Sequence, residues 1–126
     1  MEKRRVVITG LGAVTPLGHT AQVSFAAARQ GACGVDKITA FDVSDHKVKL
    51  AAEVKNLRVE EHLDKKEARK LDRFTQFALI AAQEAMQDSG LKLEQEDRAR
   101  IGVSVSSGIG GLSAIEREHS KGLDHS

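Results

Sequence analysis

The sequence predicts an α/β fold in which helices cover both faces of a sheet. Residues 4–10 place a β-branched run behind a charged flank, which is typical of a buried parallel strand. In residues 101–106, large apolar side chains alternate with glycine or serine, so this strand is also expected to be covered on both faces. Between residues 65 and 90, apolar side chains recur at three- and four-residue spacing, which indicates a long helix.

The composition fits one small folded domain of 126 residues. Hydrophobic residues make up 40%, and the 11 glycines bring the apolar share to about 49%, as in globular proteins. A net charge of +1 gives no general reason to expect nucleic acid as a partner. The single cysteine, Cys33, excludes an intrachain disulfide and a multi-thiolate zinc site. No apolar run approaches the roughly 20 residues of a membrane span, so we expect a cytoplasmic protein with no membrane partner.

The first half of the chain is expected to pass from strand to loop to helix. Residues 11–18 predict a loop, because their glycines allow turns and the only proline of the chain prevents a helix. A helix is expected to begin after His19 or Thr20, either of which suits the N-cap position, and to end near Gln30. Residues 48–54 alternate less regularly and predict an edge strand.

The helix over residues 65–90 is expected to end at Gly90. Its apolar stripe is mostly alanine in the second half, which allows close approach to a neighbouring element. The stripe consists of Leu71, Phe74, Ala78, Ala81, Ala82 and Ala85.

The first turns of this helix are strongly basic. Cations near a helix N-terminus oppose the helix dipole, so their placement favours a partner that brings negative charge. The alternative is an ordinary solvated face, balanced by Glu67 and Asp72. The cations are Lys65, Lys66, Arg69, Lys70 and Arg73.

Residues 107–111 join the second strand to another helix, which is predicted over residues 112–121. Three glycines surround Ile109 and leave it as the only large side chain of this stretch. A single apolar side chain at the carboxyl end of a buried strand is well placed to line a pocket.

The predicted sheet is too small to be complete. Two clear strands and one irregular strand cannot cover each other's edges while helices cover both faces. The sequence therefore predicts the opening part of a larger domain.

Several catalytic motifs are absent. Gly10 and Gly12 follow a strand, but Thr15 stands where a dinucleotide fingerprint needs its third glycine, and no P-loop is present. Residues 102–106 have the start of a nucleophile elbow without its closing glycine. The five histidines show no metal-ligand spacing. No complete catalytic constellation is present.

Three blocks, taken together, match a known family. They are RRVVITGLGAVTPLG, then KKEARKLDRFTQFAL with AMQDSGL, then RIGVSVSSGIGGL. The chain resembles the N-terminal part of a β-ketoacyl-acyl-carrier-protein synthase of the type II system of bacterial fatty acid synthesis. The resemblance implies a thiolase-like fold, in which each αβαβα half holds a mixed sheet between helix layers, and a homodimer. It also implies that residues 1–126 are a partial N-terminal domain, truncated before the segment with the nucleophile.

The implied activity is acyl transfer followed by carbon–carbon bond formation, without a cofactor. Family members load an acyl chain from acyl carrier protein onto a cysteine, decarboxylate malonyl-carrier protein and join the two by Claisen condensation. The cysteine, two histidines and a lysine of the family lie beyond Ser126, and Cys33 does not match the nucleophile's motif. The stretch alone is therefore expected to be inactive.

The resemblance carries two roles onto residues of this chain. Ile109, with Gly108 and Gly110 beside it, matches the position that gates the acyl pocket and limits chain length. The second role is docking of acyl carrier protein. It falls on Lys65, Lys66, Arg69 and Lys70.

Three alternatives stay open. The chain is also compatible with a non-catalytic partner resembling a chain-length factor, with a module that docks carrier protein without processing it, or with a modular polyketide synthase domain. The start at Met1, with no linker before it, favours a stand-alone enzyme over a modular one.

Overall fold

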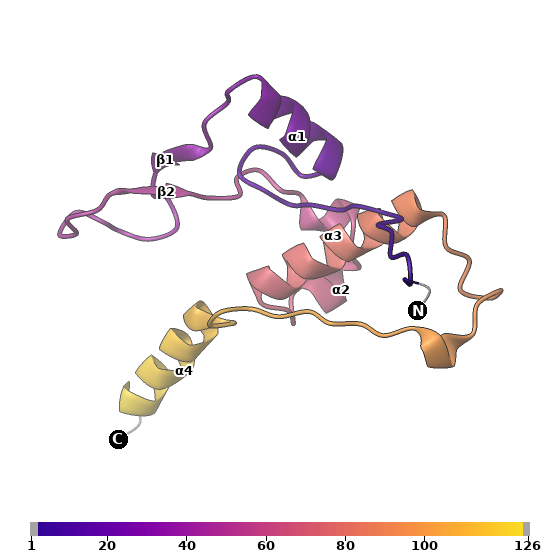
Figure 1. Ribbon diagram of the computed structural model, residues 1–126. Coiled ribbons are helices and arrows are strands. Elements are labelled where there is room, and N and C mark those ends of the chain that lie inside the picture. Colours follow the sequence, from indigo (N-terminus) through magenta and orange to yellow (C-terminus); the bar gives the residue numbers. More distant parts are fainter. Residues whose placement is uncertain (1–2, 125–126) are drawn as a thin grey trace. The chain divides into compact units, whose positions relative to one another are not determined.

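The structure is a computed structural model that describes residues 3–124 (Figure 1). The chain divides into two compact units, of which one holds residues 3–58 and 80–91 and the other residues 59–79 and 92–124. The boundary falls inside the longest helix, α3. The elements in chain order are α1 (Ala21–Arg29), β1 (Val35–Lys37), β2 (Leu50–Ala52), η1 (Val59–Glu61), α2 (Lys65–Ala68), α3 (Arg73–Ser89), η2 (Arg98–Arg100) and α4 (Leu112–Asp124).

Helix α1 confirms the prediction made from its capping residues. Thr20 is the N-cap, and its hydroxyl oxygen accepts a hydrogen bond from the Val23 N–H at 3.2 Å. The helix ends at Arg29, and Gly31 follows with φ of +74°. This left-handed conformation favours glycine and stops the helix where the sequence predicts.

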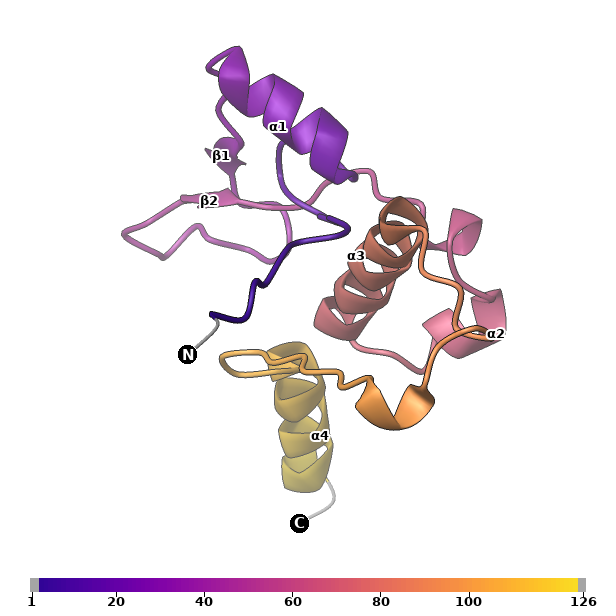
Figure 2. The ribbon, with the colours of Figure 1, turned by 45° about the vertical axis from the view of Figure 1, so that its right-hand side comes forward.

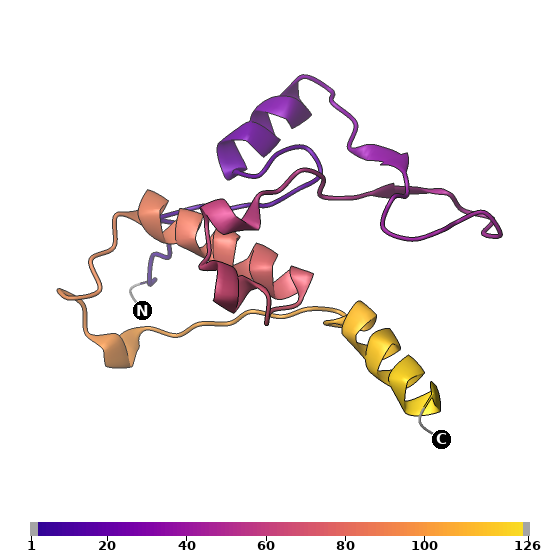
Figure 3. The same cartoon turned by 180° about the vertical axis from the view of Figure 1, so that it is seen from behind.

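The stretch of residues 10–13 lies directly against α3 (Figure 3). A Cβ atom on Gly10 would collide with the backbone of Ala85, and one on Gly12 with the backbone of Ala81. Two glycines on the loop and small residues on the helix therefore bring two backbones together. This confirms the prediction that the alanine stripe of α3 allows the close approach of a neighbouring segment.

Carboxylates of α3 hold the same stretch by hydrogen bonds. Asp88 Oδ2 accepts from the Leu11 N–H at 2.8 Å, and Glu84 Oε2 accepts from the Ala13 N–H at 2.8 Å. The other oxygen of Glu84 accepts from the N–H of Ala21, the first residue of α1, at 2.9 Å. One half-buried side chain thus ties both the loop and the start of α1 to α3.

Strands β1 and β2 form a two-stranded antiparallel sheet, in which Val35 pairs with Ala52 and Lys37 with Leu50. This confirms the edge strand predicted within residues 48–54, over three residues. Its partner, β1, was not predicted, because three residues are too few to show a period.

Glu53, directly after β2, holds the stretch that follows β1. Its carboxylate accepts hydrogen bonds from the Thr39 hydroxyl at 2.8 Å, the Thr39 N–H at 3.0 Å and the Ala40 N–H at 3.1 Å. The bonds from Thr39, the hydroxyl first, lower the pKa of Glu53.

The strands predicted over residues 4–10 and 101–106 are not strands in the structure. Neither segment pairs with another strand among the described residues, and their apolar side chains are exposed, up to 90% for Val6 and 87% for Val103. Apolar periodicity predicts an extended segment, but a strand also needs a neighbouring strand with which its backbone groups form hydrogen bonds. The expectation of an incomplete sheet agrees with this result.

The helix predicted over residues 65–90 is interrupted, and the prediction of one continuous helix was wrong. Helix α2 ends at Ala68 and α3 begins at Arg73 (Figure 2). The side-chain amide of Gln76 donates to the carbonyl oxygens of Ala68 at 2.8 Å and Leu71 at 3.3 Å. In a continuous helix these carbonyls would accept from backbone N–H groups four residues later. The stop at Gly90, which has φ of +64°, is confirmed.

Little of the described chain is buried. Among residues 3–124, only Ala68 and Ile80 are buried apolar residues, at 8% and 3% exposure. Large apolar side chains such as Phe25 and Ile115 remain exposed. No described helix is both long and apolar enough to cross a membrane. The described residues therefore present apolar surfaces that no closed hydrophobic core covers.

Replacing Gly12 by Ala should destabilise the protein by about 1–3 kcal/mol, because the added methyl group forces the loop away from the α3 backbone. Chemical denaturation of the two proteins measures the difference. Gly122→Ala is the matched control. A Cβ there meets nothing within 4 Å, and alanine inside α4 should stabilise by about 0.5–1 kcal/mol. Equal stability of Gly12→Ala and wild type would contradict this packing.

The Glu53 contacts predict a pH dependence of the local structure. Since the folded state lowers the pKa of Glu53, its stabilising contribution is complete above the ordinary glutamate range and disappears as pH falls through the lowered value. NMR titration should show the Thr39 and Ala40 amide signals moving with the Glu53 carboxyl signal. Glu53→Gln should abolish that movement. Titration of Glu53 within or above the ordinary range would exclude these contacts in solution.

Candidate functional site

The glycine loop, residues 107–111, leads into α4 and contains the predicted pocket residue. Ser107 Oγ accepts a hydrogen bond from the Gly110 N–H at 3.0 Å, which closes the loop on itself. Gly110 has φ of +80°, a conformation that side chains disfavour. The Ile109 side chain is 72% exposed, and a Cβ on Gly108 would meet nothing within 4 Å. The structure thus presents Ile109 as an isolated apolar group.

The other side of the glycine loop lies against the start of α3. The nearest atoms to a Cβ built on Gly110 belong to the Phe74 ring, at 3.8 and 3.9 Å. A Cβ on Gly111 would overlap the carboxylate of Asp72, whose Cγ would lie 2.5 Å away. Sequence reasoning missed both contacts, because they join residues more than 30 positions apart.

The basic patch, formed by Lys65, Lys66, Arg69 and Lys70, lies on α2 and the turn after it. All four side chains are exposed. Lys70 Nζ contacts Glu67 Oε1 at 3.1 Å, a solvated pair that contributes little. Among the described residues, the other three cations have no acidic side chain within ion-pair distance.

Contrary to the prediction, the four cations of the patch do not lie at the start of a long helix. The helix that starts at Lys65 has four residues, and its N-cap, Asp64, accepts from the N–H groups of Lys66 at 2.9 Å and Glu67 at 3.1 Å. A short helix with a carboxylate at its N-terminus does not place these cations against a long helix dipole. The argument for an acidic partner rests instead on exposed cations without local partners.

The patch and the glycine loop belong to the same unit. The turn at residues 69–72 links them. It carries two cations of the patch, Arg69 and Lys70, and ends at Asp72, which lies beside the loop. The basic patch thus lies at the beginning of this turn, and the glycine loop lies beside its end.

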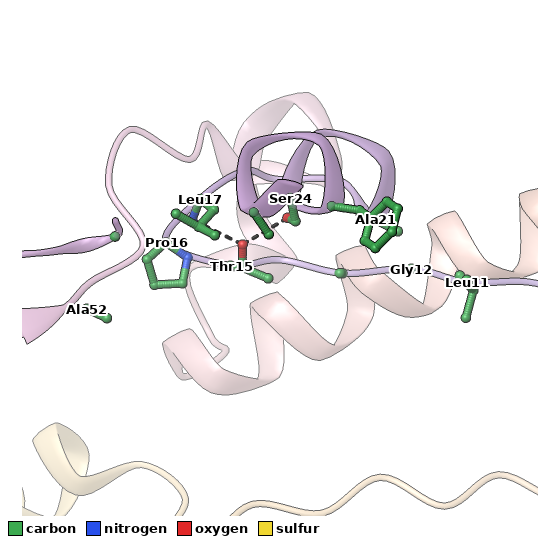
Figure 4. Close-up of a pocket in the computed structure, with 12 residues that line it drawn as sticks. Leu11, Gly12, Thr15, Pro16, Leu17, Ala21, Ser24 and Ala52 are labelled. Atoms are coloured by element: carbon green, nitrogen blue, oxygen red, sulfur yellow. Dashed lines mark hydrogen bonds between the residues drawn. The ribbon is translucent and has the colours of Figure 1, made fainter. Parts of the chain in front are cut away.

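An apolar pocket of about 630 Å³ lies in the other unit, between the loop of residues 11–17 and α1 (Figure 4). Its walls include Leu11, Pro16, Leu17 and Phe25, and no titratable side chain lines it. Sequence analysis did not predict this pocket, although the apolar face of α1 was a signal for it. The only side-chain polar groups of the pocket are the hydroxyls of Thr15 and Ser24, which are hydrogen bonded to each other at 2.8 Å, and no acid or base stands beside them.

A second hollow, of about 310 Å³, lies between η1, α2 and α3 and is lined by Glu60, Lys65, Arg69 and Gln76 among others. It adjoins the basic patch and combines charges of both signs. Cys33 is exposed. Among the described residues, no group of three or more His, Cys, Asp or Glu side chains is placed to hold a metal ion.

Likeness to solved structures places the chain in a class of protein, the ketosynthases with a thiolase-like α/β fold. The chain superposes over 98% of its length on a Beta-ketoacyl synthase from Burkholderia phymatum STM815, with a TM-score of 0.76 and 26% identity, and covers 31% of that chain. The ishigamide ketosynthase/chain length factor matches 96% of this chain and 31% of its own, with a TM-score of 0.71 and 26% identity.

Within that class, the chain belongs to the beta-ketoacyl synthase family. The family description "Beta-ketoacyl synthase, N-terminal domain" matches residues 3–125. The chain is 46% identical over 123 residues to 3-oxoacyl-[acyl-carrier-protein] synthase 2 of Staphylococcus aureus (strain COL), a match that covers 98% of this chain. It spans about 30% of the length of that relative. The chain thus corresponds to the N-terminal portion of such a synthase.

Proposed function

We propose that the chain is part of an enzyme that elongates acyl chains in fatty acid biosynthesis. The reaction is decarboxylative Claisen condensation of an acyl-enzyme thioester with malonyl-acyl-carrier-protein. The observation that carries this proposal is the 46% identity, over nearly the whole chain, to a 3-oxoacyl-[acyl-carrier-protein] synthase. Residues 1–126 form a partial N-terminal domain without the nucleophile, and the complete enzyme acts as a homodimer in the cytoplasm.

The glycine loop is the gate of the acyl pocket in this proposal. The support is structural: Ile109 is the only large side chain between Ser107 and Gly111, and it is exposed. A bulky apolar group in an otherwise small-residue loop suits a position where its size limits how far an acyl chain enters.

Ile109→Phe should shorten the acyl chains that the complete enzyme accepts, because the ring takes more of the space that the chain would enter. The measurement is kcat/KM over a series of acyl-carrier-protein primers of increasing length. Ile109→Leu, which keeps the volume, is the matched control and should retain the wild-type profile. An unchanged length preference in Ile109→Phe would refute the gate.

The basic patch is the docking surface for acyl carrier protein in this proposal. Lys65, Lys66 and Arg69 are exposed and have no acidic partner among the described residues. Such cations attract an acidic protein and favour its encounter with the patch. Salt screens the charges and weakens this attraction. The relative's own name includes acyl carrier protein as the carrier of its substrate.

Reversing two charges of the patch, in the double variant Lys66→Glu with Arg69→Glu, should raise KM for carrier-bound primers about 2- to 30-fold. This corresponds to the loss of two exposed ion pairs. The deficit should shrink at high salt.

The matched control is Lys92→Glu with Arg98→Glu, which changes net charge equally on exposed residues outside the patch. It should leave KM near the wild-type value. Equal KM values for the two double variants would exclude a specific docking role for the patch.

The proposed activity itself is tested with the protein encoded by the complete reading frame. Incubation with an acyl-loaded and a malonyl-loaded carrier protein should yield the 3-oxoacyl-carrier protein and carbon dioxide, whereas residues 1–126 alone should yield neither. Failure of the complete protein to form product would contradict the proposal.

A second candidate is a non-catalytic partner of a synthase or a carrier-docking module, favoured by the likeness to a ketosynthase/chain length factor. Binding of carrier protein by the complete protein, without condensation and without a cysteine in the nucleophile segment, would support this candidate over the enzyme.

A further inference from the structure

Among the described residues, the glycine loop has close neighbours beside Gly110 and Gly111 but none beside Gly108. Ile109 is exposed, and the space beside Gly108 is open to at least 4 Å. The hydrogen bond from Gly110 N–H to Ser107 Oγ closes the loop but does not anchor it to another element. The position of Ile109 therefore depends on what the loop touches on its other side.

Phe74 provides the first of these contacts. Its ring edge lies where the side chain of residue 110 would point, at 3.8 Å from that position. The Phe74 ring is thus the nearest group on the side of Gly110 where a side chain would project. Phe74 is one residue beyond the start of α3, so a helix holds its backbone.

Asp72 provides the second contact. Its carbonyl oxygen accepts from the N–H groups of Thr75 and Gln76, both at 3.0 Å, so it occupies the N-cap position of α3. Its carboxylate lies against Gly111, whose carbonyl oxygen accepts from the N–H groups of Ala114 and Ile115 at the start of α4.

The first turn of α4 has no acidic residue of its own. The Asp72 carboxylate therefore supplies, from another element, the negative charge that a helix N-terminus favours. The carbonyl of Asp72 accepts the first hydrogen bonds of α3, and its carboxylate lies against Gly111 at the start of α4. The end of the glycine loop lies between these two helix starts.

We propose that Asp72 and Phe74 position the glycine loop and, through it, Ile109, so that they help to determine which acyl chain lengths the enzyme accepts. The inference rests on the proposed role of the loop as the gate. Neither residue is assigned contact with the substrate, and both act through the loop.

The test measures primer-length preference in the complete enzyme. The readout is the ratio of kcat/KM for a long to that for a short acyl-carrier-protein primer. Phe74→Ala removes the ring behind Gly110 and lets Ile109 recede, so this ratio should rise about 2- to 30-fold while kcat/KM for the short primer stays near wild type. Asp72→Asn, which removes the charge and keeps the shape, should shift the ratio in the same direction by less.

Phe41→Ala is the matched control, because it removes an exposed ring whose aromatic contact is with His46 and not with the loop. It should leave the ratio unchanged. If Phe74→Ala does not fold, as judged by thermal unfolding, Phe74→Leu takes its place together with Asp72→Asn.

The outcomes separate the two proposals. Folded variants of Phe74 and Asp72 with the wild-type ratio, beside a shifted ratio in Ile109→Phe, overturn the positioning role and leave the gate intact. No shift in Ile109→Phe overturns the gate and the positioning role together. A general loss of activity at all primer lengths, without a change in the ratio, also contradicts positioning.

Discussion

The contact between residues 10–13 and α3 is the interaction on which the first unit depends. Gly10 and Gly12 lack the Cβ atoms that would collide with the backbone of Ala85 and Ala81. The carboxylate of Glu84 joins the loop and the start of α1 to α3. If the loop moved away from the helix, the N–H groups of Leu11 and Ala13 would lose their carboxylate partners.

In the second unit, a side chain of α3 also forms hydrogen bonds to the backbone of a neighbouring segment. Around residues 68–72, backbone hydrogen bonds of the turn are supplemented by a side chain of α3. Gln76 satisfies two carbonyls of the turn, and Asp72 supports the glycine loop. Gln76, near the start of α3, thus adds a side-chain donor to two backbone carbonyls of the turn.

Sequence reasoning succeeded where the signal is local. Thr20, Gly31 and Gly90 mark helix ends by capping and by backbone freedom, which depend on a few neighbouring residues. It failed for residues 4–10 and 101–106, because a strand is defined by a partner that the segment itself does not contain. The break after Ala68 was missed because helical periodicity continues across it, and only the amide of Gln76 reveals the competing hydrogen bonds. The role of Ile109 comes from the family resemblance and stays a prediction, whereas the proximity of Gly110 to Phe74 needed coordinates, because it joins distant parts of the chain.

The break between α2 and α3 separates exposed charges from the packed part of the longest helix. The alanines of the stripe all lie in α3, and a methyl group added at Gly12 would collide with the backbone of this helix. Lys65 and Lys66 lie before the break and Lys70 lies within it, and all three side chains are exposed. Residues 65–70 can therefore be exchanged for a segment of different charge without altering the contact between α3 and residues 10–13.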